Sequence, residues 1–399
     1  MTAVERQLAD RVRHRLARSG RTVTPAAIVT AVREECGAAL GDSALLGLAE
    51  GLRRDLTGAG PLEDLLADPM VTDVLVNGTE VWCDRGAGLQ RAPVAWTGHE
   101  PVRRLAQRLA AQCGRALDDA HPFVDGRLAD GTRLHAVLPP VAADGPCLAL
   151  RTFRQRAFTL DELVTAGTLT DPLAELLHAL VAARFAYLVT GGTGSGKTTL
   201  LAALLSLVPG SERVVVVEDA AELHPEHPHV VALTARHANV EGAGEITLRE
   251  LVRQALRMRP DRIVVGECRG AEVAELLAAL NTGHDGGAGT LHANAPADVP
   301  ARLEALGQLG GLTREALHAQ LRAALQVVLH LRRLPGGRVL DEVCLLAPES
   351  PGGPVATTCV WRRGDGTGPA APVLARMLAD RGVPAPSVLR GLSTVDESR

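Results

Sequence analysis

The sequence is short of lysine and of aromatic residues. Lysine and arginine together number 42, and only one of them, Lys197, is a lysine. Aromatic residues make up 2% of the chain and hydrophobic residues 46%, so the cores must be built from leucine, valine, alanine and isoleucine. The formal net charge of -4 and the lack of aromatic stacking surfaces argue against a protein that coats nucleic acid.

Two further kinds of pattern are missing. No apolar run approaches the roughly 18 residues that a membrane-spanning helix needs, and the N-terminus has no apolar signal core. We therefore expect a cytoplasmic protein. The seven cysteines are scattered without a C-x-x-C pair, which favours reduced, mostly buried thiols over a disulfide framework or a zinc site.

The lone lysine lies in a glycine-rich loop of the form G-x-x-x-x-G-K-T. Its glycines allow backbone N–H groups to curl around phosphate, and the N-terminus of a following helix adds positive charge. A compact ammonium fits among phosphates where the planar arginine fork does not. We expect Lys197 to pair with the β- and γ-phosphates of ATP and Thr198 to bind Mg²⁺; the alternative is a glycine turn before an ordinary helix. The predicted phosphate-binding residues are Gly191, Gly192, Thr193, Gly194, Ser195, Gly196, Lys197, Thr198 and Thr199.

Turn residues and hydrophobic periodicity divide the chain into segments. Short valine and isoleucine runs separated by helices predict an α/β fold, with a parallel sheet that is covered on both faces. A smaller α/β N-terminal domain and an N-terminal helical segment precede this sheet. The predicted boundaries are a helical segment at 1–57, an α/β domain at 58–155, a linker at 156–170, a P-loop nucleotide hydrolase domain at 171–334 and a C-terminal extension at 335–399.

Arginines crowd the first 21 residues of the helical segment. A solvated helix face is the ordinary explanation, and a basic contact with a membrane or an acidic partner is the alternative. The arginines concerned are Arg6, Arg11, Arg13, Arg15, Arg18 and Arg21.

Acidic residues follow two strands that are expected to be buried. Glu267 directly follows the strand at 262–266, where the carboxyl end of a parallel strand faces the ligand crevice. We expect this carboxylate to orient and activate the attacking water, and a surface glutamate is the alternative. Glu218 ends the strand at 213–218, and Asp219 and Glu222 follow it. These acids could support Mg²⁺ or position the nucleophile. Loop acids or a helix cap would also explain them.

Two histidines, His284 and His292, flank a segment rich in glycine, which we expect to be flexible. A γ-phosphate donor or a relay to a neighbouring subunit is one interpretation, and structural loop histidines are another. A metal site is disfavoured because no cysteine or third histidine is suitably spaced.

Together these motifs resemble the type II/IV secretion ATPases, and most closely their CpaF/TadA-like branch, which drives tight-adherence (Flp) pilus assembly. Residues 191–199, 217–223, 255–270 and 282–294 match Walker A, an Asp box, Walker B and a His box, in that order. The resemblance extends over about 58–334. Gly287-Ala288-Gly289 stands where the family usually has a serine and often a leucine, which predicts a floppier loop, and Cys268 replaces a branched aliphatic residue.

The resemblance implies a hexameric ring in which each ATP lies between an N-terminal domain and a RecA-like domain. It gives catalytic positions to Glu267, Glu218, Glu222, His284 and His292. It also places Arg127, Arg133 and Arg151 where N-terminal-domain arginines reach the phosphates, although surface charges are the alternative. Arg269 would pair with an acid or sense a neighbouring subunit.

The function we expect is a Mg²⁺-dependent ATPase motor for pilus assembly or protein secretion. It would act at the inner face of the cell membrane by docking on an inner-membrane platform protein, without direct nucleic-acid contact. The alternatives are a conjugation-associated DNA-transfer ATPase and a non-catalytic, nucleotide-dependent scaffold.

Overall fold

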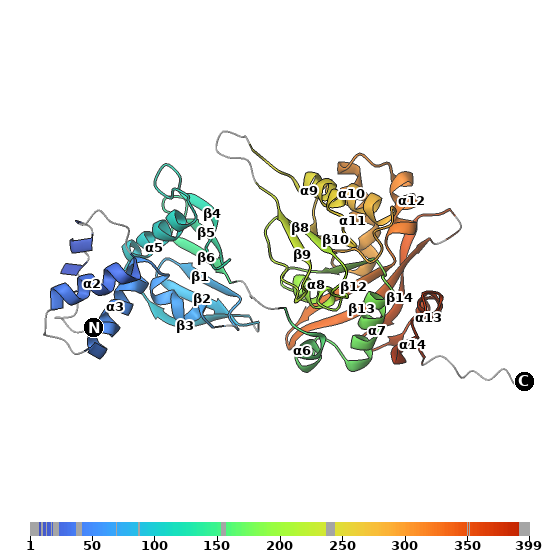
Figure 1. The fold of residues 1–399 in the computed structure, drawn as a ribbon, viewed down its shortest axis with the longest axis horizontal. Coiled ribbons are helices and arrows are strands. Elements are labelled where there is room, and N and C mark those ends of the chain that lie inside the picture. Colours follow the sequence, from blue (N-terminus) through green and yellow to red (C-terminus); the bar gives the residue numbers. More distant parts are fainter. Residues whose placement is uncertain are drawn as a thin grey trace, which may run out of the picture. The chain divides into compact units, whose positions relative to one another are not determined.

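The chain forms two compact units in this computed structural model, Met1–Arg154 and Gln155–Arg399 (Figure 1). The described residues are 8, 11–12, 14–16, 18, 24–36, 42–68, 70–86, 88–152, 157–236, 244–348, 350 and 352–390. Among the helices in these ranges, none combines the length and the apolar character that a membrane crossing requires. All seven cysteines are free, and four of them are buried, as the scattered spacing predicted.

The first unit begins with a small helical bundle containing α2 (Pro25–Cys36) and α3 (Asp42–Leu56). The predicted start of α2 is confirmed, because Thr24 Oγ1 accepts a hydrogen bond from Ala27 N at 3.2 Å. Arg15 pairs with Glu34 and Glu35 of α2 at 2.6 and 2.7 Å, as expected for a solvated helix face. Arg6, Arg13 and Arg21 lie outside the described residues.

The rest of the first unit is an antiparallel sheet of six strands in the order β3-β2-β1-β6-β5-β4. One face packs on α5 (His99–Gln112), and Val74, Val76, Leu134 and Leu150 lie in that core. The hairpins predicted at Asn77-Gly78 and around residue 130 are both present. The strands are β1 Asp73–Asn77, β2 Glu80–Asp84, β3 Leu89–Ala95, β4 Phe123–Arg127, β5 Arg133–Val137 and β6 Cys147–Arg151.

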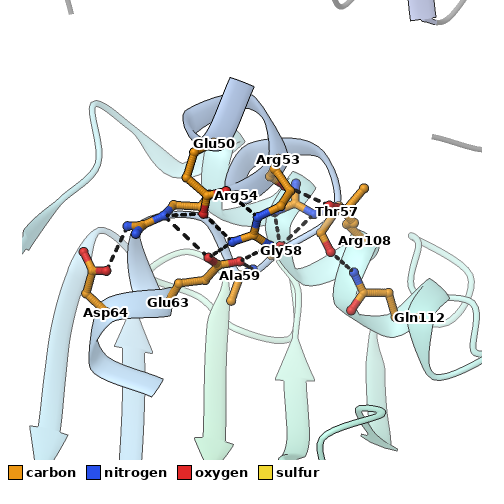
Figure 2. Close-up of polar contacts among 10 residues, drawn as sticks. All are labelled: Glu50, Arg53, Arg54, Thr57, Gly58, Ala59, Glu63, Asp64, Arg108 and Gln112. Carbon is orange, nitrogen blue, oxygen red and sulfur yellow. Dashed lines mark hydrogen bonds and ion pairs between the residues drawn. The ribbon is translucent and has the colours of Figure 1, made fainter. Parts of the chain in front are cut away.

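Polar contacts join the end of α3 to the sheet domain (Figure 2). Arg108 on α5 donates to the Gly58 carbonyl from Nε and Nη2, at 3.2 and 2.9 Å. Glu63, which begins α4 (Glu63–Leu66) after the short helix η1 (Gly60–Leu62), accepts from Ala59 N and from Arg53 Nη2. A Cβ at Gly58 would lie 1.6 Å from Glu63 Oε1, so a larger residue there would displace the Glu63 carboxylate from these contacts. At the predicted break near residue 58, hydrogen bonds therefore hold the end of α3 against α4 and α5.

The second unit is built on a large sheet with helices packed around it (Figure 1). Its nine strands lie in the order β15-β14-β13-β12-β7-β11-β10-β8-β9. Strands β9, β8, β10, β11, β7 and β12 run parallel, as predicted, whereas β13, β14 and β15 are antiparallel additions from the C-terminal extension. The bounds are β7 Tyr187–Gly191, β8 Val214–Glu218, β9 Val230–Thr234, β10 Arg262–Cys268, β11 Ala288–Leu291, β12 Val327–Leu334, β13 Gly337–Pro348, β14 Val355–Arg362 and β15 Gly366–Thr367.

Helices cover both faces of this sheet, because its valine and leucine side chains alternate between two cores. One face carries α6 (Leu160–Thr165), α7 (Asp171–Ala182), α8 (Lys197–Leu205), α13 (Ala371–Asp380) and α14 (Ser387–Arg390). The other carries α9 (Leu248–Ala255), α10 (Glu272–Leu280), α11 (Val299–Leu309) and α12 (Arg314–Ala324), with the short helices η2 (Leu256–Met258) and η3 (Pro296–Asp298).

Candidate nucleotide-binding site

The glycine-rich loop connects the fully buried strand β7 to helix α8. Gly194 and Gly196 have φ values of +70° and +97°, a region that side chains with a Cβ rarely adopt. A Cβ at Gly191 would lie 2.4 Å from Leu331 O and 2.5 Å from Ser195 Oγ. The loop therefore needs its glycines both for backbone conformation and for close packing.

The polar groups of this loop fit an anionic ligand. Lys197 Nζ donates to the carbonyls of Gly191 and Gly192 at 3.1 and 3.0 Å, so the ammonium lies over the loop. Ser195 Oγ is buried without a hydrogen-bond partner in the structure. The nine-residue helix α8 begins at Lys197, with Thr198 and Thr199 in its first turn. An ammonium, a helix N-terminus and an unsatisfied hydroxyl together form a cradle suited to a nucleotide polyphosphate.

Parallel strands bring several predicted site residues to the edge of the sheet that carries this loop. His292, just after β11, lies 3.1 Å from Thr193 Oγ1 of the loop through its Nε2. Glu267 is the sixth of the seven residues of β10, so it belongs to the strand. Its side chain is 27% exposed and can therefore reach solvent. Arg269 Nη2 donates to Glu267 Oε2 at 2.6 Å. The prediction that Arg269 pairs with an acid is confirmed.

Glu218, at the end of β8, is buried and hydrogen-bonds to the backbone of the loop that follows the strand. Its carboxylate accepts from the backbone N–H groups of Glu222 and Leu223 at 3.1 to 3.3 Å. It also packs on Gly266, where a Cβ would lie 2.5 Å from Glu218 Cγ. The backbone after β8 is irregular, so Asp219 does not cap a helix.

His284 does not join the loop. It lies before β11, and its Nδ1 is 3.1 Å from Ala279 O. His292 follows the same strand, whose four residues span about 13 Å at roughly 3.3 Å per residue. The structure thus separates the two histidines to opposite ends of one strand.

The flexibility predicted for the glycine segment is wrong. Ala288–Leu291 forms β11, which is buried between β7 and β10. A Cβ at Gly287 would lie 2.4 Å from Leu280 Cδ2 and 2.8 Å from Ile263 O. Glycine at this position reflects close packing at the start of a central strand.

The three arginines predicted in the N-terminal domain form one row. Arg127 pairs in register with Arg133, and Arg133 pairs with Arg151, so all three project from the same face of the sheet. The opposite face is the one that packs on α5. Arg127 Nε also donates to Gly131 O at 3.0 Å.

Sequence reasoning missed the residues that β12 and β13 bring to the loop. His330 of β12 is buried, and its Nδ1 lies 2.9 Å from Thr190 Oγ1, one residue before the loop. Burial lowers the pKa of His330. Arg338 Nε donates to Gly194 O at 2.9 Å. In the sequence, the Pro-Gly-Gly stretch at 335–337 indicates a hairpin. It does not indicate that this hairpin lies beside the phosphate-binding loop.

The family model for "Type II/IV secretion system protein" matches residues 55–344. The chain belongs to the type II/IV secretion system protein family. A Mycobacterium tuberculosis (strain H37Rv) relative, whose name provisionally assigns it to conjugal transfer, is 55% identical over 350 residues, covering 86% of this chain and 99% of the relative. VirB11 of Brucella suis, named as a type IV secretion system protein, is 31% identical over 259 residues, covering 58% and 72%.

Two solved structures, of an ATPase and of a pilus motor, share the fold of this chain. The Legionella pneumophila ATPase DotB matches 70% of this chain and 77% of its own, with a TM-score of 0.51 at 21% identity. The pilus retraction motor PilT, solved with ADP, matches 72% of this chain and 82% of its own, with the same TM-score at 23% identity. These matches agree with the predicted α/β fold with a P-loop.

Proposed function

We propose that this secretion-family chain binds and hydrolyses ATP at the loop 191–199. The proposal depends on the residues that lie at the carboxyl ends of the parallel strands. The loop carries Lys197 and Ser195, and His292 contacts the loop. Glu267 lies near the same end of strand β10. Lys197 would hold the β- and γ-phosphates, and Glu267 would take the proton of the attacking water. Thr198 would hold Mg²⁺, which neutralises charge on the phosphates when bound.

Replacing Lys197 tests this site directly. Lys197→Ala removes the ammonium, and Lys197→Arg keeps the charge but exchanges a compact group for a wider fork. Both variants should lose ATP binding, measured by equilibrium titration of the full chain, while circular dichroism shows unchanged folding. ATP binding by Lys197→Ala at the affinity of the parent chain would contradict the proposal.

We further propose that Arg127, Arg133 and Arg151 contact the phosphates in an assembled ring, as the motif resemblance implies. Their row on one sheet face supports a shared ligand. A bidentate arginine contact that opens after hydrolysis would tie turnover to domain movement. Arg133→Gln should lower hydrolysis at least tenfold, whereas Arg91→Gln, which breaks an exposed ion pair with Glu80 on the same sheet, should not.

The output we propose is mechanical work for a secretion or pilus-assembly system, in a ring docked on an inner-membrane platform protein. The four motifs favour a tight-adherence pilus motor. The name of the M. tuberculosis relative and that of the conjugal transfer protein TrbB, 32% identical over 230 residues, favour conjugal transfer instead. ATP turnover measured with and without single-stranded DNA separates the two. Several-fold stimulation by DNA would favour conjugal transfer, and unchanged turnover would favour pilus assembly or secretion.

A further inference from the structure

The hairpin of β12 and β13 places two arginines against the phosphate-binding loop. Arg333 and Arg338 pair in register near the hairpin end and therefore project from the same face. A Cβ at Gly194 would lie 3.3 Å from Arg333 Nη1, and one at Gly196 would lie 3.2 Å from Arg338 Cδ. Both guanidinium side chains thus lie beside the loop glycines.

The hydrogen bond from Arg338 fixes one peptide of the loop. In a trans peptide the carbonyl and the following N–H point in opposite directions. Because Arg338 holds the Gly194 carbonyl, the Ser195 N–H is turned away from Arg338. This N–H approaches Gly192 O at 3.4 Å. A contact of that length is weak. The buried, unpartnered Ser195 Oγ belongs to the same residue, so neither of its two polar groups makes a strong hydrogen bond within the loop.

The hairpin is itself anchored next to the loop. His330 contacts Thr190, and Leu331 pairs in register with Gly191, so β12 borders β7 up to the point where the loop begins. The arginines are therefore carried by two paired strands, Arg333 by β12 and Arg338 by β13, which gives better-defined geometry than a surface loop.

We propose that Arg338 is a positioning residue that holds the loop open for phosphate, and that Arg333 binds the polyphosphate of the nucleotide. This rests on the proposed function, in which the loop binds ATP. With Lys197, these arginines make the loop a site with three cations, two of them from a hairpin that follows it by more than 130 residues. Charge-assisted contacts with phosphate are the stronger class of hydrogen bond.

Binding measurements on the full chain test both roles. Arg338→Gln and Arg333→Gln should each weaken the binding of ATP and of inorganic tripolyphosphate about tenfold, the effect of one charge-assisted contact. The matched control is Arg332→Gln on the same hairpin, since Arg332 projects from the other face and pairs with Asp341 at 3.1 Å. Its binding should stay within about twofold of the parent. Arg338→Lys, which keeps a donor and the charge, should recover most of the affinity, and all variants should melt near the parent temperature.

Three results would overturn the inference. Parental ATP affinity in both Gln variants would exclude the two roles while leaving the proposed function intact. Loss of ATP binding with unchanged tripolyphosphate binding in Arg333→Gln would place that arginine on the base or ribose. An Arg338→Lys chain that melts like the parent but binds as weakly as Arg338→Gln would exclude the positioning role. If the parent chain binds neither ATP nor tripolyphosphate, the proposed function is wrong, and the roles of both arginines are excluded with it.

Discussion

Arg269 donates from Nη2 to Glu267 Oε2 at 2.6 Å, so the carboxylate proposed to activate water is held by a cation two residues further along the chain. This hydrogen bond is the largest cause of the raised pKa of Arg269, and Asp219 and Glu222 add to it. One arginine therefore compensates three carboxylates at the edge of the sheet where we place the phosphates. Without it, these acids would repel ATP.

Replacing Arg269 should weaken ATP binding. Arg269→Gln removes the positive charge that pairs with Glu267 and interacts with Asp219 and Glu222. The KM for ATP should therefore rise roughly tenfold, and kcat should fall because Glu267 loses its orienting partner. Steady-state phosphate release measures both constants. Arg253→Gln, which breaks a surface ion pair with Glu275, is the control. An unchanged KM in Arg269→Gln would show that the cation does not serve the nucleotide.

A methyl group at Gly287 should destabilise the second unit. Gly287→Ala would bring a Cβ within 2.4 Å of Leu280 Cδ2, and overpacking of this kind costs about 1–3 kcal/mol. Chemical denaturation measures the loss. Gly336→Ala on the β12–β13 turn is the matched control, since no atom lies within 4 Å of its Cβ position. Equal stability of the two variants would restore the flexible loop that the sequence suggested.

These outcomes illustrate what local sequence could and could not predict. The loop at 191–199 and Glu267 were predictable because each motif is contiguous and adjoins a strongly apolar strand. Strand β11 was missed because its four residues lie among glycines, which also mark loops. Arg338 contacts Gly194 across 144 positions through sheet topology, so no local pattern could indicate the contact. His284 carried the same family motif as His292, yet a strand separates them.

The buried histidine of β12 should make stability depend on pH. Burial lowers the pKa of His330 in the folded state, whereas the unfolded chain takes up a proton near pH 6.5. Between pH 6.5 and the lower folded pKa, the unfolded chain binds a proton that the folded chain does not. The free energy of unfolding is therefore highest above about pH 6.5 and falls as the pH drops toward the folded pKa, by up to about 1.4 kcal/mol per pH unit. His330→Gln should flatten this dependence when the free energy of unfolding is measured at pH 7.5 and 5.5. A slope equal to that of the parent chain would exclude His330 as its source.

The most direct test of the account compares ATP binding and phosphate release by the full chain and its Glu267→Gln variant. Removing one general base typically costs 10²- to 10⁴-fold in rate, while the loop and Lys197 remain to bind the nucleotide. Glu267→Gln should bind ATP with the affinity of the parent but release phosphate at least about a hundredfold more slowly. Phosphate release at the parental rate by Glu267→Gln would contradict the proposed role of Glu267.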